Sequence, residues 1–209
     1  MKFRCERDRL AEALGTAGRA VANRGGALPV LSGVQLYLAG GQLEITGSDL
    51  DLTISVTIGV DGSEDGQVVL PARLASDVVR SVEEGEVTFE TDDEQARVTG
   101  GSAEFEIRLI PADEFPRLAQ PEGDSVTLSA EAFGAALKQV IPAASSDDSR
   151  PILTGVLPDD GEVTLVLGER DAKFEIAGTR LVTRLIEGEF PNYQGLIPSG
   201  QANVLSVGR

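Results

Sequence analysis

The segment Leu28-Pro-Val-Leu-Ser-Gly-Val34 has a near copy later in the chain, Arg150-Pro-Ile-Leu-Thr-Gly-Val156, at an offset of 122 residues. A second pair, Gly85-Glu-Val-Thr88 and Gly161-Glu-Val-Thr164, is separated by only 76 residues. Because self-similar segments in the same order indicate duplicated structural units, the 209 residues are expected to hold two copies of one fold. The offset falls by 46 residues at positions 157–160, so the second copy lacks about 46 residues that the first copy has.

The hydrophobic pattern of the first copy predicts strand, helix and three strands, twice over. Apolar residues three and four positions apart predict a helix over residues 7–22, and Pro71 begins a second helix with Leu74, Val78 and Val82 on its apolar face. Alternating apolar and polar residues predict half-buried strands between them. The acidic stretch Asp61–Gly66 is expected to be a solvated loop. The fold class is therefore α+β.

The second copy follows a segment at 119–124 that is rich in Pro, Gly and charge and resembles a linker. It is predicted to begin with a strand at 125–129 and a helix whose apolar face includes Phe133 and Leu137. Four further strands are predicted at 152–157, 163–167, 173–177 and 181–186. We therefore expect a complete unit over residues 1–120 and a shortened unit over 125–209. With packing partners deleted, the region after Pro121 is expected to be protease-labile.

The composition excludes several kinds of chemistry. There is no histidine and one cysteine, so histidine-based triads, disulfides and thiolate metal clusters are excluded. Cys5 is expected to be a small, buried strand residue. Asp49 and Asp51 alternate along a strand without a third ligand, so we expect structural or solvated roles for them and no metal, cofactor or catalytic centre. No apolar run is long enough for a membrane span, so a soluble cytoplasmic protein is the default.

Several motifs in order resemble one family, the bacterial beta sliding clamp, which is the processivity subunit of DNA polymerase III. They span nearly the whole chain: Met1–Leu10 (MKFRCERDRL), Leu28–Val34 (LPVLSGV), Ile45–Ile54 (ITGSDLDLTI), Val68–Arg73 (VVLPAR), Ile107–Pro116 (IRLIPADEFP), Arg150–Val156 (RPILTGV) and Thr183–Tyr193 (TRLIEGEFPNY). None of these motifs is a catalytic signature, and the resemblance implies a scaffold that does no chemistry.

The resemblance implies a DNA-clamp fold, in which helices line one face of curved antiparallel sheets. Such clamps have three domains per chain, close head to tail into a ring around duplex DNA, and tether the polymerase. A groove on the second domain takes short peptides from polymerase and clamp-loader proteins. Arg150, Leu153 and Pro198 match groove positions, whereas the counterpart of Gly47–Leu52 falls inside the deletion and a third domain is not present in these residues.

The net charge of −16 argues against a tight nucleic-acid binder unless positive charge is concentrated locally. Arg73 and Arg80 lie seven apart on the predicted second helix and are therefore expected on one side of it, away from Leu74 and Val78. The resemblance makes Arg24, Arg73, Arg80 and Lys138 the expected DNA contacts, weak and independent of sequence. Ordinary solvated charge on amphipathic helices explains the same pattern from the residues alone.

Two other functions remain open on the sequence alone. The chain could be a non-functional remnant, or an interaction protein that pairs with or caps full-length clamps through its complete first unit. A small α+β hydrolase or sugar-binding module would need an acid/base pair in a cleft, and the sequence shows none.

Overall fold

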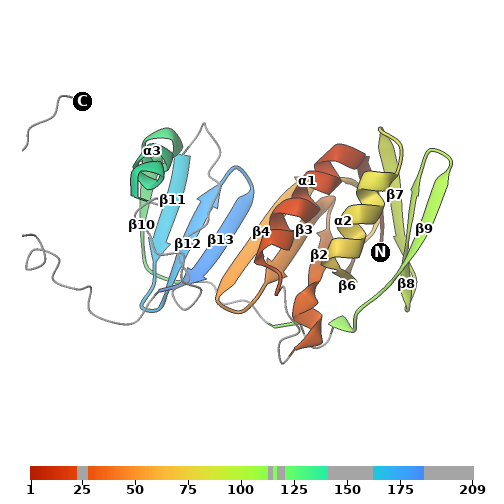
Figure 1. Cartoon of the computed structure of the whole chain (residues 1–209), viewed down its shortest axis with the longest axis horizontal. Helices are drawn as coiled ribbons and strands as arrows, with labels where there is room; N and C mark the ends of the chain where they lie inside the picture. The colour runs from red at the N-terminus through yellow and green to blue at the C-terminus, as the bar shows by residue number, and fades with distance from the viewer. Residues whose placement is uncertain (23–27, 113–114, 117–120, 141–161, 186–209) are drawn as a thin grey trace, which may run out of the picture.

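Two antiparallel sheets and three α-helices make up the computed structural model, which describes residues 1–22, 28–112, 115–116, 121–140 and 162–185 (Figure 1). The helices are α1 (Arg7–Ala17), α2 (Ala72–Ser81) and α3 (Ala130–Val140), with short 3₁₀ turns at Gly18–Ala20 and Pro29–Ser32. The strands of the first unit are β1 (Lys2–Glu6), β2 (Gly33–Ala39), β3 (Gln42–Ser48), β4 (Leu52–Gly59), β5 (Asp61–Glu64), β6 (Gly66–Pro71), β7 (Glu86–Thr91), β8 (Gln95–Gly100) and β9 (Ala103–Arg108). Those of the second are β10 (Asp124–Ser129), β11 (Glu162–Leu167), β12 (Asp171–Ile176) and β13 (Thr179–Arg184).

The strand order joins the two units through one sheet. One sheet has the order β5-β1-β7-β8-β9, and the other runs β10-β11-β12-β13-β4-β3-β2-β6. The junction is the antiparallel pair β13–β4, in which Leu181 lies opposite Ile54. Arg184 extends this junction, since its backbone N–H donates to the Asp51 carbonyl at 2.9 Å and its Nη1 lies 3.0 Å from Asp51 Oδ1.

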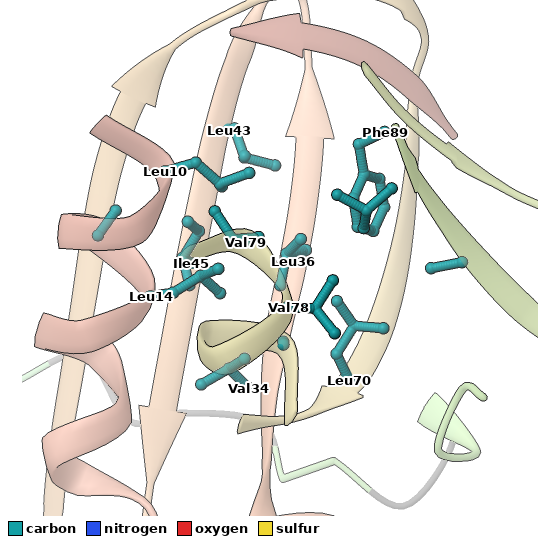
Figure 2. Close-up of a cluster of buried hydrophobic side chains, with 14 of the residues drawn as sticks. Leu10, Leu14, Val34, Leu36, Leu43, Ile45, Leu70, Val78, Val79 and Phe89 are labelled. Carbon is teal, nitrogen blue, oxygen red and sulfur yellow. The ribbon is translucent and has the colours of Figure 1, made fainter. Parts of the chain in front are cut away.

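The core of the first unit lies between helices α1 and α2 and both sheets (Figure 2). Leu10 and Leu14 of α1 and Val78 and Val79 of α2 point onto the strands that carry Leu36, Leu43 and Ile45. Phe3 of β1 and Phe89 of β7 stack with ring centroids 4.9 Å apart, so these two strands also contact each other through their side chains in the core. Burial of these side chains, at roughly 1.5–3 kcal/mol each, is the main source of stability.

Two expectations for the first unit were wrong. Asp61–Glu64 is not a loop but the edge strand β5, and Phe3 of β1 lies opposite Gly62 in their pairing. All four β5 residues are exposed, so the strand has no apolar alternation to reveal it. Leu74 is 47% exposed, because the face that α2 buries is centred on Ala75 and Val79 instead.

The second unit has a much smaller core. Ala130, Val163 and Ile176 are buried together, and Phe133 stacks on Phe174 at 6.0 Å. The predicted strand at 125–129 and the helix after it are confirmed, as are strands over most of 163–167, 173–177 and 181–186. The expected strand at 152–157 lies outside the described residues.

Candidate nucleic-acid interface

All three α-helices lie on one face of the eight-stranded sheet and form a helix layer (Figure 1). The strand register explains this arrangement. Phe174, which packs with the α3 side chains, pairs across to Leu181, and Leu181 pairs across to Ile54. Ile54 pairs with Gly47, which lies on the same strand face as the core residue Ile45. The outward surface of this layer is the candidate interface. Its exposed basic residues are Arg9, Arg19, Arg73, Arg80 and Lys138, and its exposed acidic residues are Asp8, Glu12, Asp77 and Glu131.

Arg73 projects fully into solvent from the first turn of α2. Its side chain is 97% exposed, and its Nε lies 3.9 Å from Oδ2 of Asp77, one turn along the helix. A solvent-exposed i,i+4 pair of this kind stabilises a helix by only about 0.3–0.5 kcal/mol. Arg73 can therefore leave Asp77 for a phosphate at little cost.

Arg80 lies where α1 and α2 pack side by side. A Cβ placed on Gly15 of α1 would sit 3.0 Å from Arg80 Nη2, so the glycine leaves the space that the guanidinium occupies. A glycine inside a helix costs roughly 0.5–1 kcal/mol relative to alanine. Gly15 was not predicted to matter from the sequence, although a glycine in mid-helix was a signal of close packing.

Of the other two expected DNA contacts, Lys138 lies within the described residues and Arg24 does not. Lys138 is exposed in the last turn of α3, on the same helix layer as Arg73 and Arg80. Arg24 lies outside the described residues. The three expected groove residues, Arg150, Leu153 and Pro198, also lie outside them.

Negative charge is concentrated away from the helix layer. In the described part of the chain, the strands and loops carry 22 acidic side chains and 8 basic ones. The basic residues there are mostly engaged: Arg97 lies 3.0 Å from Glu104 and 3.1 Å from Glu106, and Lys2 pairs with Glu90. The electrostatic contrast between helix layer and strands is therefore large, although the helix layer itself is close to neutral.

The carboxylates have structural partners. Asp49 Oδ1 accepts hydrogen bonds from the backbone N–H groups of Asp51 and Leu52 at 3.0 and 2.7 Å, which closes the turn before β4. Asp92 Oδ1 accepts hydrogen bonds from the backbone N–H groups of Glu94 and Gln95, both at 2.8 Å, and these bonds lower the pKa of Asp92. A lowered pKa keeps Asp92 an anion at neutral pH and opposes the role of a general acid.

Cys5 and the acidic residues give no metal or nucleophile site in the described part of the chain. Partial burial raises the pKa of the Cys5 thiol to about 11, which leaves it protonated and unreactive at neutral pH. Among the described residues, no three Cys, Asp or Glu side chains gather closely enough to hold a metal ion.

The sequence of residues 1–119 matches the family described as "DNA polymerase III beta subunit, N-terminal domain". The chain is 32% identical to the beta sliding clamp of Streptomyces coelicolor, in an alignment that covers 95% of this chain and 67% of the relative. It is 36% identical to the beta sliding clamp of Micrococcus luteus over 75% of this chain and 50% of the relative. A beta sliding clamp homolog from Streptomyces muensis, GriR, is 32% identical, and the match covers 44% of its length.

Solved structures share the fold. A DnaN sliding clamp from Pseudomonas aeruginosa matches 97% of this chain with a TM-score of 0.85 at 22% identity, over 69% of its own length. A DNA polymerase sliding clamp from Bacillus subtilis matches 96% of this chain with a TM-score of 0.85 at 24% identity, over 68% of its length. This confirms the expected α+β DNA-clamp fold. Every helix in the described part of the chain is too short or too polar to cross a bilayer.

The chain matches about two thirds of the length of the Streptomyces coelicolor relative, half of the Micrococcus luteus relative and less than half of GriR. Within that span, the family match covers the whole first unit, and the fold agrees with solved clamps over nearly all of the chain. The chain therefore belongs to the family of the beta sliding clamp, the non-catalytic beta subunit of DNA polymerase III.

Proposed function

We propose that this protein is a sliding clamp that encircles duplex DNA and tethers the polymerase, and that it holds the duplex weakly and without sequence preference against its helix layer. The observation that carries the proposal is the charge distribution: exposed arginines stand on the helices, and the acids gather on strands and loops. Phosphate contacts by Arg and Lys release counterions and carry no sequence information. Arg73 and Arg80 supply such contacts, and Arg24 and Lys138 extend them. Weak contacts of this kind suit a protein that slides.

We also propose that the chain is one complete clamp unit over 1–120 and a shortened unit over 125–209. Two observations support this division. The alignment with the Streptomyces coelicolor clamp has 254 positions, more than the 209 residues of the chain, so some of those positions have no counterpart here. In the structure, β1 pairs with both β5 and β7, whereas β10, its counterpart in the repeat, pairs only with β11 among the described strands.

The test of DNA contact is binding of a fluorescent duplex at several salt concentrations. The variant carries Arg73→Glu and Arg80→Glu, and the control carries Arg97→Glu and Arg108→Glu, which change the net charge equally at exposed arginines on β8 and β9 outside the helix layer. We expect the double variant to weaken binding about tenfold or more and to flatten the salt dependence by nearly one unit of log–log slope for each lost contact. Equal effects of variant and control would assign the binding to net charge alone.

The test of sliding is retention on circular DNA. A clamp that encircles DNA stays on a closed circle and is released when the circle is cut. A protein that never shows this difference, alone or with a clamp loader, binds DNA without encircling it, and the sliding proposal then fails.

The second candidate function is an interaction protein that pairs with or caps full-length clamps through residues 1–120. The family match over the whole first unit, residues 1–119, favours it, because this is the part that would pair with a full-length clamp. Light scattering of mixtures with a full-length clamp separates the two functions, because a capping protein forms a mixed complex and blocks loading. Binding of polymerase and clamp-loader peptides near Arg150, Leu153 and Pro198, and a cytoplasmic location, stay predictions drawn from the family.

A further inference from the structure

Within the described part of the chain, β10 has a strand neighbour on one side only, whereas its counterpart in the first unit, β1, has one on each side. β1 lies inside its sheet, with β5 on one side and β7 on the other. β10 (Asp124–Ser129) ends the eight-stranded sheet, with β11 as its one neighbour among the described strands. The segment corresponding to β5 falls within the 46-residue gap of the repeat. Among the described strands, the backbone donors and acceptors on this side of β10 therefore have no strand partner, whereas those of β1 pair with β5.

This edge lacks the protection that the other sheet edges carry. Native edge strands are shielded by charge, proline or irregularity, since an unshielded edge templates pairing with another chain. β5 has two acids among its four residues, β9 alternates Glu104, Glu106 and Arg108, and β6 ends in Pro71. β10 has a single charge, Asp124, at its beginning, followed by Ser, Val, Thr, Leu and Ser. It is the edge most open to another strand among those described.

Exposed apolar side chains lie beside this edge on the helix-bearing face. Val126 is 51% exposed and Leu167 on β11 is 53% exposed. Because Val126 lies opposite Leu165, Val126 and Leu167 are diagonal neighbours on the face that also carries Val163 and α3. Figure 1 shows α3 over β10 and β11 with no second described helix beside it, whereas α1 packs against α2.

We propose that β10 is a pairing surface for a second copy of this chain. A two-fold axis perpendicular to the sheet sets the two β10 strands antiparallel and keeps both α3 helices on the same face. A register centred on Val126 brings the two exposed valines together and places Asp124 of one copy opposite Leu128 of the other. No two carboxylates then face each other. The second copy supplies the strand that the deletion removed from the β10 edge.

The proposal does not rest on DNA binding, and the oligomeric state of the full chain tests it. We expect light scattering to give twice the 21.9 kDa of one chain at micromolar concentration. Val126→Lys sets like charges opposite each other across the axis, so the dimer should be lost at concentrations where the parent chain is dimeric. The matched control is Leu74→Lys, which also replaces a half-exposed aliphatic residue with lysine but lies on α2, and its dimer should persist.

Cross-linking tests the same pairing without a substitution that is meant to disrupt the dimer. In a Cys5→Ala background, Val126→Cys places two thiols on side chains whose Cβ atoms lie about 4.5–5.5 Å apart across the axis. Mild oxidation should then yield a covalent dimer, and Ser63→Cys on the β5 edge should not. A monomeric parent chain, together with a Val126→Cys variant that forms no cross-link, would overturn the proposal. So would a dimer that survives Val126→Lys, or a chain that pairs only with full-length clamps.

Discussion

The contact between β3 and the end of α1 makes Gly47→Ala the most informative substitution in this chain. A Cβ on Gly47 would lie 2.1 Å from the carbonyl oxygen of Ala17 and 3.1 Å from a methyl carbon of Val21. Non-bonded heavy atoms are most favourable at about 3.5–4.0 Å, so the end of α1 must move by more than about 1 Å to admit the methyl group. The obstacle is backbone, which cannot rotate away.

The expected cost follows from this geometry. Overpacking a closed contact typically costs about 1–3 kcal/mol, and a backbone obstacle places Gly47→Ala at the upper end of that range. Gly18→Ala is the matched control: Gly18 ends α1 with φ −61° and ψ −15°, and its Cβ would meet nothing within 4 Å. There the lost freedom of the unfolded chain should stabilise the protein by about 0.4–1 kcal/mol.

The assay is urea unfolding followed by far-UV circular dichroism, because the chain has no tryptophan for fluorescence. The two alanine variants should move the midpoint in opposite directions with similar slopes. Thermal midpoints should shift by about 2–4 °C for each kcal/mol. A Gly47→Ala variant within about 0.5 kcal/mol of the parent would refute the tight contact between α1 and β3, and with it the stated position of the helix layer.

Three further predictions concern titration and local stability. Because the pKa of Cys5 is raised to about 11 from 9.0, its contribution to stability is full below pH 9 and is lost as pH rises toward 11; Cys5→Ala should reduce that alkaline loss in urea titrations. The hydrogen bond from Arg180 lowers the pKa of Glu175, so its stabilisation is present above pH 4.5 and fades below it; Arg180→Ala should raise the Glu175 pKa measured by NMR. Limited proteolysis should cut first after Pro121, and equal resistance of both units would contradict the small second core.

Local patterns in the sequence predicted most of the elements correctly. The apolar spacing around Leu10 and Leu14 placed α1, and the alternation over Leu52–Gly59 placed β4, because each pattern reports which face of an element is buried. The exposed strand β5 was missed because all its residues are polar or glycine and none is buried. The orientation of α2 was misjudged because alanines contribute to its buried face as much as Leu74 was expected to.

The candidate interface was predictable in part. The positions of Arg73 and Arg80 off the apolar stripe followed from helical periodicity, and the structure finds both exposed. The approach of Arg80 to Gly15 and the pairing of Arg73 with Asp77 depend on side-chain geometry. Likewise, no local periodicity in the sequence shows that α1 and α2, which are far apart in the chain, lie side by side.

The repeat, the 46-residue gap, the α+β class and the family resemblance all follow from residue order, because duplication and periodicity are properties of the chain itself. The joining of the two units is a property of the fold. Any exposed strand edge offers the same donors and acceptors, so only the assembled structure selects β4 as the partner of β13 and leaves β10 at the end of the sheet. That non-local choice gathers the three helices on one face and creates the edge at which a second copy is expected to pair.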